Sequence, residues 1–298
     1  MLSPACVPML FRGAADPGAA GRLAAEVLGW PALGGALYDA GNAVVGFTPA
    51  GADAGTDLDP AWELEVVPAD WDDAVLRLAA ALGRTVEEMA GSVAYDAVGR
   101  SLAFHDAAGN LTVLAQPTWR ARVGRAGRKL GGLMAVREEE GGASAVVGAT
   151  LHVSSLPRSL RFYRDRLGMA PLRVTPREAR FDAGPLILTL RAERRVGMVA
   201  DAARRGALRD TLVFRVDELE AEVAALAARG VEIPPPRGGG ACAERTAGFA
   251  DPDGHRLVLW EPPDPALPGP PRSYASVLER IAARAAASHE SRFALEAP

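Results

Sequence analysis

A predicted strand near the middle of the chain carries the histidine best placed to do chemistry. In Ala149-Thr150-Leu151-His152-Val153, Thr150 and His152 share one face because side chains alternate along a strand. An imidazole titrates near neutral pH, so His152 could act as a general base or donate a hydrogen bond to a ligand. The alternative is a structural histidine bonded to a neighbouring backbone group.

Two later predicted strands carry a second group of candidate ligand-binding residues. Thr211, Val213 and Arg215 alternate along one strand, and Val258 and Trp260 along the other. A guanidinium can pair with a carboxylate or phosphate, and an indole can stack on a planar ring. The alternatives are an ion pair of Arg215 with a neighbouring carboxylate and a tryptophan in the core. Because most of these positions are apolar, they favour ligand binding over acid–base catalysis.

The elements that must position these residues repeat along the chain. Three motifs of the first half recur in the second half in the same order, at offsets of 139, 143 and 145 residues. The pairs are Leu28-Gly29-Trp30 with Leu167-Gly168-Met169, Tyr38-Asp39-Ala40-Gly41 with Phe181-Asp182-Ala183-Gly184, and Phe104-His105-Asp106-Ala107-Ala108-Gly109 with Phe249-Ala250-Asp251-Pro252-Asp253-Gly254. Apolar periodicity predicts helices at 18–28, 72–82, 158–167 and 218–229, with strands before and after each. The chain is therefore a duplicated domain, and each half contains two similar strand–helix–strand units.

Two motifs of the second half resemble the vicinal oxygen chelate superfamily, which includes glyoxalase I, extradiol dioxygenases and bleomycin-binding proteins. They are Phe162-Tyr163 followed by Leu167-Gly168, and the later Asp251-Pro252-Asp253-Gly254. The resemblance implies an α+β fold of two tandem domains, each made of paired βαβββ modules that form a curved, partly open sheet around a cavity. We therefore expect a degenerate glyoxalase-like domain at 5–118, a linker at 119–144, a second glyoxalase-like domain at 145–263, and a Pro-rich segment with a C-terminal helix at 264–298.

The resemblance also implies a divalent metal such as iron, manganese, nickel or zinc, held by His and Glu side chains. The matching positions carry other residues. In the second half they are Gly148, Ile187 or Thr189, Thr211 and Val258, and in the first half Met9, Val44 or Gly46, Trp62 or Glu63, and Val113. Such a metal needs at least three converging donors. We therefore expect no metal and no other cofactor, and we place Thr189 among the ligand-binding residues.

Other polar residues are expected outside the site. Glu63 and Glu65 share one face of a predicted strand, and an exposed face is the default for glutamate. His255 lies in a turn and is expected to be exposed, and Glu261 is expected to reach solvent from the end of a strand. Glycine pairs and an acidic run make 120–142 typical of a linker.

Composition limits the possible functions. The chain has 298 residues, of which 49% are hydrophobic and 23% charged, which is typical of a globular protein. A formal charge of −4 gives no general attraction to nucleic acid. No apolar run is long enough to span a membrane, and no basic region precedes an apolar stretch at the start, so we expect a cytoplasmic protein. The expected partner is a small molecule, and the expected assembly is a monomer or homodimer.

Two hypotheses of function follow. The first is a metal-independent protein, similar to glyoxalases and bleomycin-resistance proteins, that binds a small organic molecule in the C-terminal domain; an aromatic compound or natural product would suit it. The alternative is an enzyme of the same superfamily, such as a lyase, isomerase, cyclase or extradiol-dioxygenase-like protein of secondary metabolism or aromatic catabolism. In that case His152 is the candidate general base.

Overall fold

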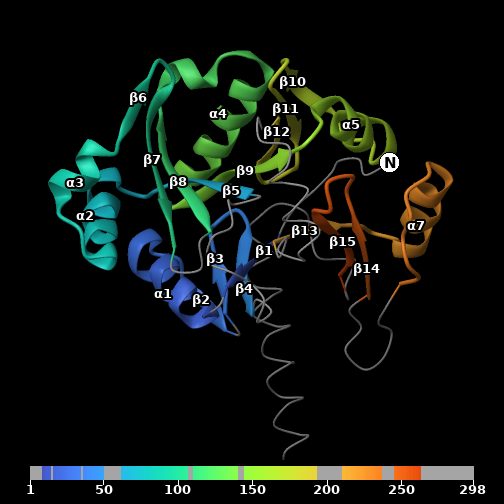
Figure 1. Ribbon diagram of the computed structural model, residues 1–298, viewed down its shortest axis with the longest axis horizontal. Helices are drawn as coiled ribbons and strands as arrows, with labels where there is room; N and C mark the ends of the chain where they lie inside the picture. The colour runs from blue at the N-terminus through green and yellow to red at the C-terminus, as the bar shows by residue number, and fades with distance from the viewer. Residues whose placement is uncertain are drawn as a thin grey trace, which may run out of the picture.

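Two mixed β-sheets with helices against them form the protein in the computed structural model (Figure 1). The structure describes residues 9–14, 16–34, 36–49, 62–106, 110–139, 144–192, 210–236 and 245–262. The α+β class predicted from the sequence is confirmed. The predicted C-terminal helix and both cysteines lie outside the described residues.

Sheet A has seven strands in the order β14-β15-β13-β1-β4-β3-β2. Its strands are β1 (Met9–Ala14), β2 (Ala32–Gly34), β3 (Leu37–Asp39), β4 (Val44–Pro49), β13 (Thr211–Arg215), β14 (Arg245–Ala250) and β15 (Arg256–Glu261). Sheet B has eight strands in the order β10-β11-β12-β9-β5-β8-β7-β6. Its strands are β5 (Trp62–Val67), β6 (Ala94–Asp96), β7 (Gly99–His105), β8 (Leu111–Pro117), β9 (Ala145–Val153), β10 (Pro171–Val174), β11 (Glu178–Asp182) and β12 (Ile187–Ala192).

Both sheets combine strands from the two halves of the chain. In sheet A, β1 pairs antiparallel with β13, so Phe11 lies opposite Thr211. In sheet B, β5 pairs antiparallel with β9, so Glu63 lies opposite Thr150. Each sheet thus joins two strand–helix–strand units, or modules. The first module (β1–β4) shares sheet A with the fourth (β13–β15), and the second (β5–β8) shares sheet B with the third (β9–β12).

Several helices begin at a side-chain cap. The helices are α1 (Pro17–Leu28), α2 (Trp71–Leu82), α3 (Val86–Gly91), α4 (Gly124–Glu139), α5 (Leu156–Arg161) and α7 (Leu219–Ala228), with a 3-10 turn at η1 (Trp119–Arg122) and a π-helical turn at η2 (Phe162–Arg166). The side chains of Asp16 and Asp70 cap the first turns of α1 and α2. Gly29 and Gly83 end these helices with positive φ angles of 69° and 63°.

The segment predicted as a linker is largely helical. α4 occupies 16 of its residues and packs against β9 to β12. Its Met134 forms a small apolar cluster with Val67, Val147 and Leu130. The interior glycines hid this helix from the sequence pattern, because glycine lowers helix propensity.

The central strands of sheet B turn one set of side chains toward the main core. Trp62, Leu64 and Val66 of β5 belong to that core. The alternate residues, Glu63 and Glu65, therefore lie on the opposite face. We call this opposite face the polar face of sheet B.

Candidate functional site

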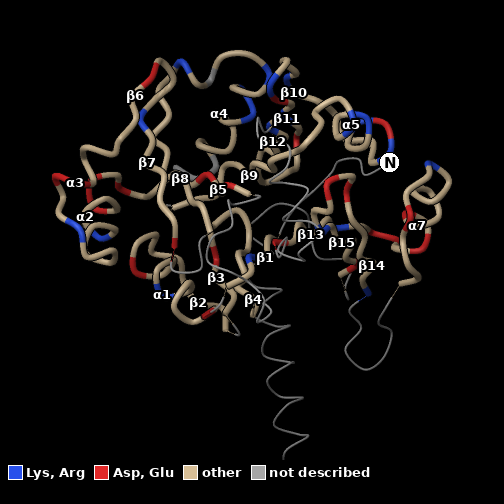
Figure 2. The backbone as a smooth tube through the Cα atoms, in the orientation of Figure 1, with Lys and Arg blue, Asp and Glu red and all other residues tan. Residues whose placement is uncertain are grey.

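The polar face of sheet B gathers charged and hydroxyl side chains from the four neighbouring strands β5, β9, β12 and β11. Strand pairing sets successive residues side by side across the sheet. One row consists of Leu111, Glu63, Thr150, Thr189 and Arg180. The next row toward α4 consists of Val113, Glu65, Gly148, Ile187 and Asp182, and a third row on the other side holds His152, Arg191 and Glu178. Figure 2 shows the acidic positions of β5 and the basic positions of β10 to β12.

Glu63 joins His152 and Arg191 into one network. His152 Nε2 lies 2.8 Å from Glu63 Oε1, and Arg191 Nη1 donates to both Glu63 oxygens at 2.8 and 3.1 Å. Burial alone would raise the pKa of Glu63, but the hydrogen bond to His152 and the charge of Arg191 outweigh it, so the pKa is lowered. The ionised carboxylate therefore fixes the orientation of the imidazole and the guanidinium.

Glu65 lies two residues further along the same face and differs from Glu63 in its contacts. Its carboxylate makes no hydrogen bond or ion pair with any residue in the described part of the chain. Burial raises its pKa, and the nearby charges of Arg180 and Arg191 offset only part of that effect. Glu65 is thus a carboxyl group with unused hydrogen-bonding capacity in the middle of the polar face.

Gly148 provides the room that Glu65 occupies. A Cβ atom added to Gly148 would lie 3.1 Å from Glu65 Oε2 and 3.4 Å from Glu65 Cβ. The position that the resemblance assigns to a first metal ligand is therefore filled by the side chain of the facing strand.

Two arginines flank this carboxyl group on the side of β11 and β12. Arg180 Nε donates to Glu178 Oε1 at 3.0 Å, which leaves its two terminal nitrogens available. Arg191 bonds Glu63 through Nη1 alone, and its side chain is 41% exposed. Both guanidinium groups can therefore still donate hydrogen bonds to an incoming molecule.

The predicted site residues are divided between the two sheets. Thr150, His152 and Thr189 lie on the polar face of sheet B, beside Glu63 and Arg191. Thr211, Val213, Arg215, Val258 and Trp260 lie on sheet A. The expected shared cavity depended on pairing within the second half, whereas β9 and β13 belong to different sheets.

On sheet A, Arg215 and Trp260 make the contacts named as alternatives to ligand binding, an ion pair and a place in an apolar cluster. Val213 and Trp260 are buried with Met9 and Val44 in an apolar cluster. Arg215 Nη2 lies 3.6 Å from Asp217 Oδ1, which is the neighbouring carboxylate named as the alternative partner.

The positions implied for a metal do not fit one. On sheet B they include Gly148, Ile187 and Val113, which carry no donor side chain. On sheet A they include Met9, Val44 and Val258, which are equally unsuitable. Among the described residues, no group of three His, Cys, Asp or Glu side chains is arranged to hold a metal ion.

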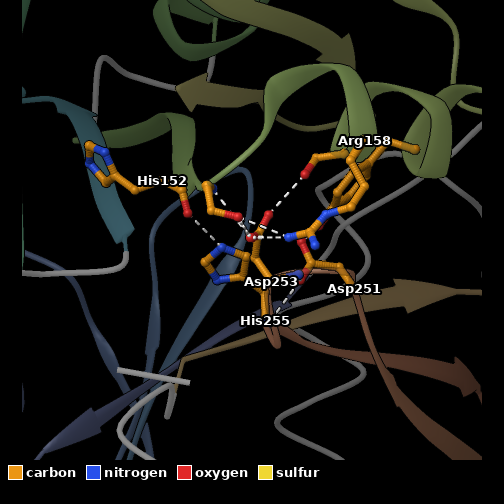
Figure 3. A network of polar contacts seen from close by, with 8 residues as sticks. His152, Arg158, Asp251, Asp253 and His255 are labelled. Atoms are coloured by element: carbon orange, nitrogen blue, oxygen red, sulfur yellow. Dashed lines mark hydrogen bonds and ion pairs between the residues drawn. The ribbon is translucent and has the colours of Figure 1, made fainter. Parts of the chain in front are cut away.

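A turn from sheet A holds the strands of this site in place (Figure 3). His255 is fully buried, which corrects its expected exposure in a turn. Its Nε2 donates to the carbonyl oxygen of His152 at 2.9 Å, and its Nδ1 accepts from Trp62 Nε1 at 3.2 Å. One neutral imidazole thus ties the backbone of β9 to the residue next to Glu63.

Asp253 fastens the same turn to α5. Its carboxylate accepts from Arg158 Nη2 at 2.7 Å, from Ser159 Oγ at 2.9 Å, and from the hydroxyl of Ser154. Asp251 accepts from Tyr163 Oη at 3.1 Å. The two sequence motifs that suggested the family therefore bind one another. Glu261, expected in solvent, instead accepts from Leu219 N at 2.8 Å and caps α7.

A small cavity elsewhere cannot hold an organic ligand. It lies between α1 and the two sheets, is lined by Arg12, Asp106, Thr112 and apolar side chains, and has a volume of about 20 Å³. That volume holds about one water molecule. The polar face of sheet B is therefore the stronger candidate.

The sequence missed the residues that make this face polar. Glu63, Glu65, Arg180 and Arg191 were not among the predicted site residues. One signal was present, since Glu63 and Glu65 alternate with the apolar Trp62, Leu64 and Val66, which predicts a half-buried strand with both carboxyl groups on one face.

Comparisons with known proteins agree with this architecture. Residues 146–259 match the model of the Glyoxalase/Bleomycin resistance protein/Dioxygenase superfamily. A "putative dioxygenase" from Bacillus subtilis is 12% identical, with a TM-score of 0.56 over 91% of this chain and 89% of that chain. A mutant form of glyoxalase I from Zea mays is 15% identical, with a TM-score of 0.55 over 86% of this chain and 93% of that chain. These structures share the fold.

No curated protein matches the chain. Within the described residues, no helix is long and apolar enough to cross a membrane. Residues 146–259 are thus similar in sequence to this superfamily, and most of the chain shares the fold of the two solved structures.

Proposed function

We propose that the protein binds a small organic molecule on the polar face of sheet B and does so without a metal. The observation that carries the proposal is Glu65, a carboxyl group with a raised pKa and no hydrogen-bond partner among the described residues. Binding sites commonly place a few such polar groups among apolar neighbours. A cytoplasmic location and a sequestering role similar to bleomycin resistance remain part of this proposal.

The neighbours of Glu65 define the chemistry of the ligand. Glu65 suits a hydroxyl or amine group, which would donate to the carboxylate or accept from the carboxylic acid. The free nitrogens of Arg180 and Arg191 suit an acceptor such as a carbonyl or carboxylate. Ile187 and Val113 flank Glu65 in the same row and provide apolar contact. A planar compound with adjacent hydroxyl and carbonyl groups would use all of these features.

A binding screen with a matched control tests the proposal. Hydroxylated and aminated aromatic acids serve as probes in a thermal-shift assay, and the best probe is then titrated by calorimetry. We expect Glu65→Gln to weaken its binding about tenfold or more, since a hydrogen bond to a charged group contributes about 1.5–3 kcal/mol. Glu87→Gln, at an exposed position on α3, should leave binding unchanged. Loss of probe binding after dialysis against EDTA, or an affinity unchanged by Glu65→Gln, would contradict the proposal.

Proton transfer is a second candidate function, and the raised pKa of Glu65 favours it. A carboxyl group whose pKa is raised by burial is a better general acid than an ordinary glutamate. His152, oriented by Glu63, remains a candidate for the opposite role. In a lyase or isomerase, the Glu65→Gln variant would retain probe binding but convert none of the probe.

A further inference from the structure

Helix α4 packs on the polar face of sheet B, next to the proposed binding site. Met134 and Leu130 contact Val67 and Val147. Val67 follows Glu65 on the same face of β5, and Val147 precedes Gly148 in β9. Figure 1 shows α4 between the β6–β7 hairpin and strands β10 to β12.

One ion pair adds to this apolar contact. Lys129 Nζ lies 2.7 Å from Asp182 Oδ1, and the two side chains are 22% and 43% exposed. Asp182 lies opposite Ile187 in the row of Glu65. A partly exposed pair of this kind contributes about 0–1 kcal/mol. Among the described side chains, one apolar cluster and one ion pair therefore join α4 to this edge of the polar face.

The sequence of α4 also makes the helix weak by itself. Its interior contains Gly127, Gly131 and Gly132, and each glycine lowers helix stability relative to alanine. Basic residues occupy its first turns and acidic residues its last turn, which is the unfavourable arrangement for the helix dipole. By contrast, α2 has the side-chain cap Asp70 and an acidic first turn. α4 thus depends on docking for its structure.

We infer that α4 is a displaceable cover of the polar face, held by Met134 and Lys129 and released by local unfolding. Release would widen access to Glu65 from the side of Val67. The biological meaning of the cover rests on the proposed function, but the opening of the helix does not. An opening equilibrium can therefore be measured without knowing the ligand.

The chain provides its own reporter of this opening. Lys129 is the only lysine in the sequence. In the docked helix its amine is paired with Asp182, and the lysine side chain is partly buried. Acylation by N-hydroxysuccinimidyl acetate, followed by peptide mass spectrometry, gives the rate at Lys129 relative to the N-terminal amine. We expect labelling of Lys129 to be limited by the opening of α4.

Two substitutions should move this rate in opposite directions. Gly132 is exposed, and an added Cβ would meet no atom within 4 Å, so Gly132→Ala strengthens the helix without a new contact. It should slow labelling about fivefold. Met134→Ala should accelerate labelling by tenfold or more, because it removes the main apolar contact. Gly91→Ala in α3, which also meets no atom within 4 Å, is the matched control and should change nothing.

Hydrogen exchange provides an independent measurement on the same variants. We expect amides at 127–135 to exchange at least tenfold faster than those of α2, and Gly132→Ala to slow them selectively. The inference that α4 is a displaceable cover would be overturned if amides in α4 exchanged as slowly as those in α2 and if neither substitution changed the labelling rate of Lys129. If labelling responds as expected while Glu65→Gln leaves probe binding intact, the cover stands and the proposed function falls.

Discussion

Glu63 and Glu65 show how neighbouring atoms decide the chemistry of one residue type. Both carboxyl groups lie on one face of β5, two residues apart. Glu63 receives hydrogen bonds from His152 and Arg191, and its pKa is lowered despite burial. Glu65 receives none from the described residues, and burial raises its pKa. Alternation in the sequence shows that the two share a face, but it does not show which one has partners.

The raised pKa of Glu65 predicts a pH-dependent cost to stability. A group whose pKa is higher in the folded protein stabilises the fold below its unfolded pKa, and this stabilisation is lost as the pH rises through the folded pKa. Glu65→Gln should therefore be more stable than the wild type at pH 7.5, with the difference vanishing near pH 4. Urea unfolding at a series of pH values measures this. A variant less stable than the wild type at neutral pH would show that the carboxylate has a stabilising partner.

At the scale of elements, the sequence predicts regular strands and helices well and their contacts less well. The strand 62–67 and the helix 72–82 are confirmed to within one residue, because apolar spacing and terminal glycines are local signals. α4 and the buried position of His255 were missed. Glycines obscured the helix, and burial of the turn depends on Trp62 and His152, which are distant in sequence.

The turn between β14 and β15 should contribute strongly to stability through Asp253. Its side chain is 2% exposed and accepts hydrogen bonds from Ser154, Arg158 and Ser159. Replacement by alanine leaves these donors without an acceptor, and we expect a loss of about 2–4 kcal/mol.

Urea unfolding of Asp253→Ala, beside a surface control, measures this loss. Asp217 is 84% exposed, so Asp217→Ala should change stability by less than about 0.5 kcal/mol. Equal effects of the two substitutions would show that the turn does not fasten sheet A to α5.

At the scale of the whole molecule, the duplicated pattern predicts the modules but not their partners. The apolar pattern of each module identifies the buried face of its strands and of its helix. It does not identify the partner, because four similar modules can pair in more than one way. The structure pairs the first with the fourth and the second with the third. This pairing places Thr211 and Trp260 on a different sheet from His152 and brings Glu63 beside it.

The pairing predicts how the protein behaves when it is cut between its halves. A fragment of residues 1–118 would contain β1 to β8, and a fragment of residues 119–298 would contain β9 to β15. Alone, each fragment would expose strands that normally pair with the other, namely β1 and β5 or β9 and β13. We expect each fragment by itself to be unfolded or aggregated. Together, expressed in one cell, they should form a 1:1 complex with the circular dichroism spectrum of the intact chain.

Size-exclusion chromatography with light scattering distinguishes this arrangement from independent domains. Two independent domains would give two folded monomeric fragments whose spectra sum to that of the intact protein, and that result would contradict the sheet order. The complex should also restore the contact between His255 and Trp62, since these residues come from different fragments. The chain has five tryptophans, so the emission of Trp62 is taken as the difference between complexes with and without Trp62→Phe. His255→Phe in the second fragment should change this difference, because the indole N–H then loses its acceptor.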